Sequence, residues 1–466
     1  MTDAAPRADA TTLLAVVALG SFLTSMASSV LNVALPDMAR SLEVGPAAAG
    51  WFMLSFLLTV TALLLTAGRL GDLLGHGRTY LAGFVFFGFG AIACAAAPTA
   101  LVLDIARVAQ GVGSALVLAA SPALITMSVP PSKRGSALGF MSTAVYLGLA
   151  LGPPVGGILV AHAGWRVIFI AAAVAAAIVL AVGARTLPLA RPIGKAVGFD
   201  LGGSALIAAG LLALLLLCTR GPEWGVTHPA TLGTGLAALL ILPGFIWLEG
   251  RHPSPTLDLK LFDSVVFSGA AVAAMLNYIS MFILLFSLPF ALRDGQNMPP
   301  EIVGRVLAAQ AAGMALFAWG AGALADRIGS RGLAAVGMGI FGVGGLGLLL
   351  AWPTANPWAP ALWMFVCGAG TGIFISPNSS ALMGAAPKER LGTAGGVMAL
   401  ARNLGMALGV ALGSGLFASV LREHTGPVEW SAAADGAVRI GFGISAGLAF
   451  LAGLVALAAP SLSRRP

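Results

Sequence analysis

The sequence predicts an all-α polytopic membrane protein, and three observations support this class. Apolar residues make up 58% of the 466 residues and charged residues only 9%, whereas a soluble protein carries about 25% charged residues. The mean hydropathy is +0.95. The third observation is a series of fourteen apolar runs, most of them as long as the roughly 20 residues that a helix needs to cross a bilayer.

The fourteen predicted segments follow one another through mostly short connections. The first begins at Thr12, and we interpret it as a retained helix rather than a signal peptide. The predicted spans are 12–34, 47–68, 80–97, 101–129, 135–161, 165–184, 201–219, 231–249, 266–291, 301–323, 333–351, 358–384, 392–420 and 438–459.

The distribution of Lys and Arg predicts the orientation. With both termini in the cytoplasm, sixteen of the 25 basic residues fall on the cytoplasmic side and seven near the outer helix ends. Cytoplasmic loops of membrane proteins carry this excess. We therefore expect a multi-pass protein of the cell (inner or plasma) membrane, and we attribute the net charge of +7 to its loops and not to a nucleic-acid partner.

Two distant parts of the chain are similar to each other. The stretch "GRLGDLLGHGR" at 68–78 parallels "GALADRIGSRG" at 322–332, and "GLALG" at 148–152 parallels "GMALG" at 405–409. These offsets of 254 and 257 residues predict two parallel copies of one six-helix unit, a device of transporters. The expected organisation is a cytoplasmic N-terminus (1–11), a six-helix bundle (12–184), a linker with two additional transmembrane helices (185–265), a second bundle (266–459) and a cytoplasmic tail (460–466).

The repeated loop predicts a conformational gate. Its glycines permit a tight turn and close helix approach, and a charge cluster at a helix end can hold one conformation and release another. The alternative is an ordinary solvated loop. The expected gate residues are Gly68, Asp72, Gly75, Arg78, Asp326 and Arg331.

The fourth segment contains a charged pair. Arg107 lies within an apolar run, where a charge costs at least roughly 2.5–3.5 kcal/mol at the bilayer centre and so indicates function. Asp104 and Gln110 lie on the same helical face. Asp104 is the single carboxylate that we place inside a predicted span. The alternative is a structural Asp–Arg pair in which the two charges only neutralise each other.

Further polar residues lie at membrane depth and could line a substrate path. The alternative for each is a hydrogen bond between helices. The expected cavity residues are Asn32, Trp51, Gln110, Tyr146, Asn277, Tyr278, Gln310, Asn378, Arg402 and Asn403.

The fifth segment contains "ALGPPVGG" at 150–157. Glycines at i, i+4 and i+8 form a flat face for close helix packing, and the second half keeps this spacing at Gly405, Gly409 and Gly413 without the prolines. Because proline removes a backbone donor, the pair predicts a bending point specific to the first half. The residues of this motif are Gly148, Gly152, Pro153, Pro154, Gly156 and Gly157.

Motifs of catalysis are missing from the sequence. It contains no HExxH, no GxSxG and no Walker loop, so we do not expect an enzyme or transport driven by the chain's own ATP hydrolysis. The three cysteines form no CxxC pair. We expect no metal and no cofactor. The expected partners are a small-molecule substrate, protons and the lipid bilayer, and the expected functional unit is a monomer.

These motifs, in this order, resemble the major facilitator superfamily, and more specifically its fourteen-helix drug:proton antiporter branch. The loop 68–78 is similar to the family's loop 2–3 signature, and "RVAQGVG" at 107–113 to its helix-4 motif. The latter resemblance implies that Arg107 takes part in proton coupling. The fifth segment resembles the helix-5 motif associated with exporters, and "LNVALP" at 31–36 the end of helix 1. Trp51 resembles the start of helix 2, and "GWRVIFI" at 164–170 the entry to helix 6.

One position departs from the branch. Many members carry an Asp in helix 1, where this chain has Ala27. With Arg107 and Arg402 inside, we expect a cavity that favours neutral or anionic substrates, with Asp104 as the proton carrier. The leading hypothesis is a proton-coupled exporter of hydrophobic or amphipathic compounds such as drugs, antibiotics or secondary metabolites. The alternatives are a nutrient symporter on the same fold, or a lipid flippase or non-transporting sensor.

Overall fold

A computed structural model describes residues 10–130, 134–189, 201–251, 259–353, 356–387, 391–421 and 427–458. Within these ranges the chain is helical and contains no strand. Fourteen helices are long and apolar enough to cross a membrane, which confirms the predicted fold class. The predicted tail 460–466 and the first nine residues of the predicted N-terminus lie outside the described residues.

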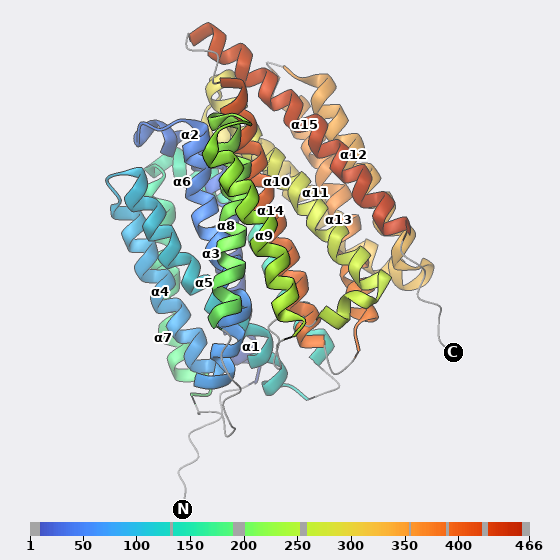
Figure 1. Ribbon diagram of the computed structural model, residues 1–466. Coiled ribbons are helices and arrows are strands. Elements are labelled where there is room, and N and C mark those ends of the chain that lie inside the picture. The colour runs from blue at the N-terminus through green and yellow to red at the C-terminus, as the bar shows by residue number, and fades with distance from the viewer. Residues whose placement is uncertain are drawn as a thin grey trace, which may run out of the picture.

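The helices form two side-by-side groups with a pair between them in the chain (Figure 1). The first group is α1 (Ala10–Ser29), α2 (Leu31–Ser41), α3 (Pro46–Leu74), α4 (His76–Ala96), α5 (Ala100–Ser128), α6 (Arg134–Ala163) and α7 (Arg166–Thr186). The pair is α8 (Leu201–Trp224) and α9 (Pro229–Glu249), followed by the short helix η2 (Leu259–Asp263). The second group is α10 (Val265–Phe290), the π-turn η3 (Ala291–Gly295), α11 (Pro300–Ile328), α12 (Ser330–Ala351), α13 (Trp358–Ala385), α14 (Leu391–Leu421) and α15 (Pro427–Ala458).

The two ends of the bundle differ. We call the end at which α1 begins the inner end, and the opposite end, which holds α2 and η3, the outer end (Figure 1). The first predicted segment, 12–34, is longer in the structure, because α2 continues it to Ser41. The ninth is longer too, because η3 continues α10 to Gly295. These two extensions bring additional charged residues to the outer end.

The glycine stripes of the two halves pack in the same way. In α6, a Cβ on Gly148 would lie 2.3 Å from the Phe22 carbonyl oxygen, and one on Gly156 would lie 2.5 Å from the Val30 carbonyl oxygen. In α14, a Cβ on Gly405 would lie 2.6 Å from the Met275 carbonyl oxygen. The missing side chains therefore let α6 lie against α1 and α2, and α14 against α10, with backbone in contact.

The inner turns of the two halves also match. Gly75 joins α3 to α4 with φ 94°, and Gly329 joins α11 to α12 with φ 96°. A side chain is strained in this left-handed region, so both turns require glycine. The two positions are 254 residues apart, the offset that the repeated loop predicts.

The additional pair α8–α9 covers one side of the junction between the groups. Apolar residues of α8, Ile207 and Leu211, cluster with Leu58 of α3 and Leu404 of α14. Near the outer end, a Cβ on Gly415 of α14 would lie 2.2 Å from the Cys218 carbonyl oxygen. Helix α8 therefore contacts both groups (Figure 1).

Candidate functional site

Two matching contacts close the outer end between the groups. A Cβ on Gly157 of α6 would lie 2.9 Å from the Cα of Gly304 of α11, and a Cβ on Gly50 of α3 would lie 2.8 Å from the Cβ of Ser414 of α14. Gly50 and Gly304 are 254 residues apart, and Gly157 and Ser414 are 257 apart. The same contact therefore occurs twice, on opposite sides of the molecule.

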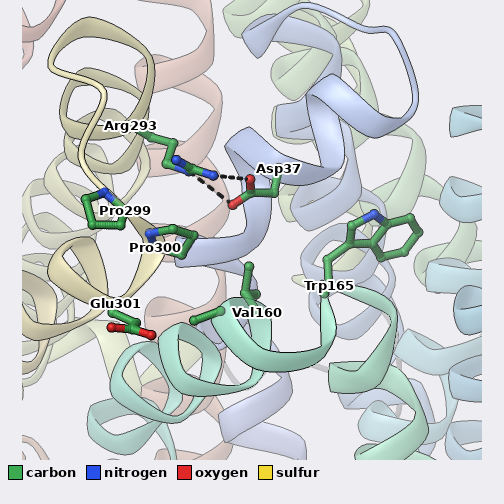
Figure 2. A pocket seen from close by; sticks show the side chains of 9 residues that line it. Asp37, Val160, Trp165, Arg293, Pro299, Pro300 and Glu301 are labelled. Carbon is green, nitrogen blue, oxygen red and sulfur yellow. Dashed lines mark hydrogen bonds and ion pairs between the residues drawn. The ribbon is translucent and has the colours of Figure 1, made fainter.

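Ion pairs join the groups between these contacts. Nη2 of Arg293 in η3 lies 2.8 Å from Oδ1 of Asp37 in α2, and the Arg293 Nε–H donates to Oδ2 of Asp37 at 3.4 Å (Figure 2). Nε of Arg40 lies 3.4 Å from Oδ1 of Asp294, and Nη2 of Arg40 lies 3.3 Å from Oδ1 of Asp37. Two acids and two bases thus link α2 to η3.

The same helices are not in close contact toward the inner end. A Cβ on Gly68 of α3, Gly395 of α14 or Gly320 of α11 would have no heavy atom within 4 Å. Gly50 and Gly304, on the outer parts of α3 and α11, have close neighbours. The groups are therefore joined more tightly at the outer end than at these inner positions.

Three of the predicted cavity residues lie near one another between the groups at mid-depth. The side chain of Tyr278 in α10 is close enough to that of Tyr146 in α6 for the two to interact, and the positive charge of Arg402 in α14 acts on Tyr278. Each residue lies roughly 17–20 Å along its helix from the inner end, at 1.5 Å per residue. We call Tyr146, Tyr278 and Arg402 the central cluster.

Several buried polar atoms have no hydrogen-bond partner among the described residues. Both amide atoms of Asn277, which precedes Tyr278, belong to this set, as do Nε2 of Gln310 and Oγ1 of Thr371. Nε1 of Trp51 and Oδ1 of Asn32 lie nearer the outer end and are also without a partner. An unpaired polar group in a membrane costs several kcal/mol, so these atoms fit a site that receives a ligand or water.

Arg107 lies in the interior of the first group. Its Nε–H donates to the Phe52 carbonyl of α3 at 2.8 Å, its Nη1 to Oε1 of Gln110, and its Nη2 to the Ala27 carbonyl of α1 at 3.5 Å. The guanidinium carbon lies 4.2 Å from the ring centroid of Phe56. One side chain therefore connects α1, α3 and α5.

Asp104 lies close to the outer start of α5 and is partly buried. The Ser55 hydroxyl of α3 donates to its Oδ1 at 3.5 Å. The positive charges that act on it are those of Arg107 and of Arg220 in α8. Asp104 therefore lies where α3 and α5 approach α8, about one helical turn from the outer end of α5, and away from the depth of the central cluster.

The remaining predicted cavity residues make local or interhelical hydrogen bonds. Nδ2 of Asn378 in α13 donates to the Ala270 carbonyl of α10 at 2.9 Å. Nδ2 of Asn403 donates to the Ala399 carbonyl one turn before it at 2.8 Å, and Nδ2 of Asn32 to the Ser29 carbonyl at 2.8 Å. These bonds are those expected for helix packing.

The predicted gate residues lie at the inner turns. Oδ1 of Asp72 lies 3.2 Å from Nε2 of His76, and Arg78 is exposed. In the second half Arg331 is exposed, whereas the side chain of Asp326 lies outside the described ones. The glycine at position 68 is partly exposed.

The outer ion pairs were not predicted from the sequence. Asp37 and Arg293 lie beyond the predicted first and ninth spans, and no role was predicted for either residue. A signal was present, because the two residues are 256 residues apart, within the range of offsets set by the repeat. Residues at equivalent positions of two parallel copies can meet at the axis that relates the copies.

Metal binding finds no support in the described ranges, where no group of three or more His, Cys, Asp or Glu side chains could hold an ion. The titratable residues of the site instead lie in the outer ion pairs, at Asp104 and in the central cluster. This arrangement provides charge at the outer end and hydrogen-bonding groups at mid-depth.

Comparison with known proteins gives the family. The chain matches the Major Facilitator Superfamily over residues 17–272 and 270–466. It is 29% identical over 409 residues to the riboflavin transporter RibZ of Clostridioides difficile (strain 630), with 88% of each chain covered. It is 32% identical over 414 residues to the multidrug resistance protein Stp of Mycobacterium tuberculosis, covering 88% of this chain and 76% of the relative. It is 30% identical to the tetracenomycin C resistance and export protein of Streptomyces glaucescens, covering 91% and 78%.

Solved structures share the fold at low sequence identity. A bacterial homolog of the human lysosomal transporter Spinster, in an inward-facing and unoccupied conformation, superposes with a TM-score of 0.70 at 14% identity, covering 97% of this chain and 96% of that one. The xylose transporter XylE from E. coli, in an inward open conformation, gives a TM-score of 0.64 at 15% identity, covering 98% of each chain. The fourteen spanning helices, the fold and the sequence matches agree, and the chain belongs to the Major Facilitator Superfamily as a multi-pass membrane transporter that is similar to drug-resistance exporters, not an enzyme.

Proposed function

We propose that this transporter exports neutral or anionic hydrophobic or amphipathic small molecules in exchange for protons, from a cell membrane in which both termini are cytoplasmic. The observation that carries the proposal is the central cluster. Tyr146, Tyr278 and Arg402 come from helices of both groups and lie near one another at mid-depth. A site between the two halves can face each side in turn as the halves rock about it.

The chemistry of the cluster favours a particular substrate class. Two phenolic hydroxyls can donate and accept hydrogen bonds, and the guanidinium of Arg402 adds a positive charge. The unpaired amide of Asn277 lies next to Tyr278 in the chain and adds donor and acceptor capacity. The position at which related exporters carry an acid is Ala27, which is buried. A site with this composition attracts carbonyl-rich, phenolic or anionic molecules and repels cations.

The outer contacts keep the outer end of the transporter closed in this conformation. The ion pairs of Asp37 and Arg293 and the contact of Gly157 with Gly304 hold the outer ends together, while Gly68 and Gly395 are open toward the inner end. In this conformation we propose that substrate reaches the central cluster from the cytoplasm. Release to the outside then requires the outer contacts to separate.

Two named relatives support export. One is a multidrug resistance protein and another a tetracenomycin C resistance and export protein. The relative named riboflavin transporter supports an uncharged aromatic compound as a substrate without fixing a direction. Uptake by a symporter is therefore the second candidate.

Transport in proteoliposomes tests the proposal. We expect an inward proton gradient to drive efflux of riboflavin or tetracenomycin C, and to drive efflux of the cationic dye ethidium at least tenfold more slowly. Abolition of the gradient with a protonophore should stop efflux. Accumulation of labelled riboflavin by cells that express the protein would favour uptake instead, and transport of ethidium in preference to both other compounds would contradict the substrate class.

Substitutions in the central cluster test the site itself. Tyr278→Phe and Arg402→Met should each weaken binding of the transported compound at least fivefold, measured by quenching of tryptophan fluorescence. The chain has three tyrosines, and the third supplies a matched control. The Tyr80 hydroxyl donates to the Val16 carbonyl at 2.7 Å inside the first group, so Tyr80→Phe should leave binding unchanged. Equal effects of the two Tyr→Phe variants would exclude a specific role for Tyr278.

A further inference from the structure

A pocket of about 380 Å³ lies at the outer end between the two groups. Its lining includes Val160 and Trp165 from the first group and Pro300 and Glu301 from the second. The carboxylate of Asp37 and the guanidinium of Arg293 meet in its wall (Figure 2). Because the pocket opens to the outer face, water and protons from that side reach the ion pair without passing through the bundle.

The two residues of this ion pair come from corresponding parts of the internal repeat. Asp37 and Arg293 are 256 residues apart, within two residues of the offset of 254 that relates Gly50 to Gly304, so they occupy closely corresponding positions of the two halves. The flanking contacts of Gly157 with Gly304 and of Gly50 with Ser414 are equivalent to each other in the same sense. The ion pair therefore lies between two matching contacts, at the place where equivalent residues approach each other only while the outer ends are together.

A second ion pair continues the first, so that four side chains of alternating charge contact one another in a row. Arg40 contacts Asp294 across the groups and Asp37 within its own helix. The Asp37, Asp294 and Arg293 side chains are 17–20% exposed, whereas that of Arg40 is 50% exposed. The acids are thus shielded enough for their charges to act strongly on the arginines and open enough to exchange protons with water.

We propose that Asp37 and Asp294 form a proton-binding site that releases the outer end of the transporter. A proton from the outer solution adds to a carboxylate oxygen and produces a neutral acid, while the arginines keep their charge. One of the two ion pairs between the groups is then lost. Arg293 and Arg40, one on each group, are left with a single carboxylate between them, and the excess positive charge favours separation.

Other titratable or charged residues lie toward the outer ends of the elements packed around this site. They include Glu43 after α2, His162 in α6, Arg166 in α7, Glu301 and Arg305 in α11, and Asp435 and Arg439 in α15.

Some of these residues have defined contacts of their own. Arg166 lies over the ring of Trp165 with 4.1 Å to its centroid, Nε1 of Trp352 donates to Asp435 at 3.0 Å, and Nδ1 of His162 lies 2.9 Å from the Ile158 carbonyl oxygen. Glu301 lines the pocket itself. It is therefore the acid that must be distinguished from Asp37 and Asp294.

This inference goes beyond the proposed function, because it concerns how the outer end opens and not what is carried. The site is separate from Asp104 and from the central cluster. An exchange of substrate for protons needs a conformation open to the outside, and protons that bind at Asp37 and Asp294 would favour that conformation from the correct side. The test below uses no substrate, so its result is independent of the transport assays.

Distances between spin labels test the proposal. Labels at Leu101→Cys in α5 and Trp358→Cys in α13 mark the outer ends of the two groups at exposed positions, in a background with Cys94, Cys218 and Cys367 replaced by alanine. Labelling at neutral pH precedes transfer of the full-length protein in nanodiscs to pH 8 or pH 5.5. Double electron–electron resonance should show one shorter distance at pH 8 and a growing longer-distance population at pH 5.5.

Variants separate the proposed acids from other groups. Asp37→Asn and Asp294→Asn should each raise the longer-distance population at pH 8, and the double variant should lose the pH response. Glu301→Gln should keep it. The charge exchange Asp37→Arg with Arg293→Asp should restore the shorter distance at pH 8, which also shows that the altered chains fold. An unchanged distance at both pH values in the parent, or a full pH response in the double variant, would overturn the proposal.

Discussion

Gly157 of α6 and Gly304 of α11 contact each other backbone to backbone, with a Cβ on Gly157 only 2.9 Å from the Cα of Gly304. Gly157 is the last residue of "ALGPPVGG", whereas Gly148, Gly152 and Gly156 face α1 and α2. One helix therefore uses two glycine faces. The first packs within its own group, and Gly157 packs against the other group at the outer end.

Adding a methyl group at this junction should open the outer end. Gly304→Ala would place a Cβ 3.0 Å from the Cα of Gly157, which is tighter than an ordinary van der Waals contact, so α6 and α11 should move apart by a few tenths of an ångström. We expect faster alkylation of Val160→Cys by a membrane-impermeant maleimide, since Val160 is buried in the outer pocket. Gly320→Ala on the same helix meets no atom within 4 Å and should leave the rate unchanged. Equal rates for the two variants would show that the junction does not control access.

The two prolines of α6 should contribute to movement and not to folding. Helix α6 runs without interruption from Arg134 to Ala163 with Pro153 and Pro154 inside it. Each proline removes a backbone hydrogen bond and, in a helix interior, costs about 3 kcal/mol relative to alanine. Replacing both with alanine should therefore give a stiffer helix.

The expected result for Pro153→Ala with Pro154→Ala is normal expression, a Tm no lower than that of the parent, and a loss of gradient-driven efflux of at least tenfold. The equivalent helix α14 has Val410 and Ala411 after Gly409 and remains helical, so alanines are compatible with the packing. Efflux at the parental rate would limit the stretch to a packing role.

The fold could be predicted from the sequence because bilayer crossing depends on length and composition. Fourteen apolar runs predicted fourteen spans, and the described part of the chain contains fourteen. The ends of these helices were harder to predict, because α2 and η3 contain charged residues that hydropathy assigns to loops. Asp37 and Arg293 compensate for each other's charge only in three dimensions, so no local pattern shows that they pair in a partly buried site.

The candidate site, too, could be predicted only in part from the sequence. Arg107 was recognisable as an unusual charge in an apolar helix, but its partners are largely backbone carbonyls of Phe52 and Ala27, which the sequence cannot identify. Asp104 is one turn from Arg107 and feels its charge, but the hydrogen bond to its carboxylate comes from Ser55 of another helix. Tyr146 and Tyr278 belong to different halves, and their contact depends on how the halves close. The roles of these residues stay predictions.

Asp104→Asn should uncouple transport from the proton gradient. The amide keeps the size of the carboxyl group and can still accept from the Ser55 hydroxyl, but it cannot gain or lose a proton. We expect gradient-driven efflux to fall at least tenfold while exchange of labelled for unlabelled substrate continues. Ser55→Ala removes the hydrogen bond and keeps the carboxylate, so it should retain coupling. Undiminished gradient-driven efflux by Asp104→Asn would contradict a coupling role.

Gly75→Ala should strain the inner turn of the first half. The residue has φ 94°, a conformation that costs an L residue roughly 1–2 kcal/mol, and Gly329→Ala should have the same effect at the equivalent turn. We expect a lower Tm for both variants. Gly68→Ala, at a helical position with no atom within 4 Å of the added Cβ, should keep the parental Tm, and a matching loss there would point to a general sensitivity of the loop.

Arg107→Lys should separate the charge of this residue from its geometry. Lysine keeps the positive charge, but its single ammonium group cannot reach the Phe52 carbonyl, Gln110 and the Ala27 carbonyl together as the guanidinium does. Acceptors that lose a buried donor cost about 1–3 kcal/mol each, so we expect a lower Tm and slower substrate exchange as well as slower gradient-driven efflux. Gln110→Met removes one partner alone and should lower the Tm by less. If Arg107→Lys reduces only gradient-driven efflux, the charge and its protonation partner matter more than the link between α1, α3 and α5.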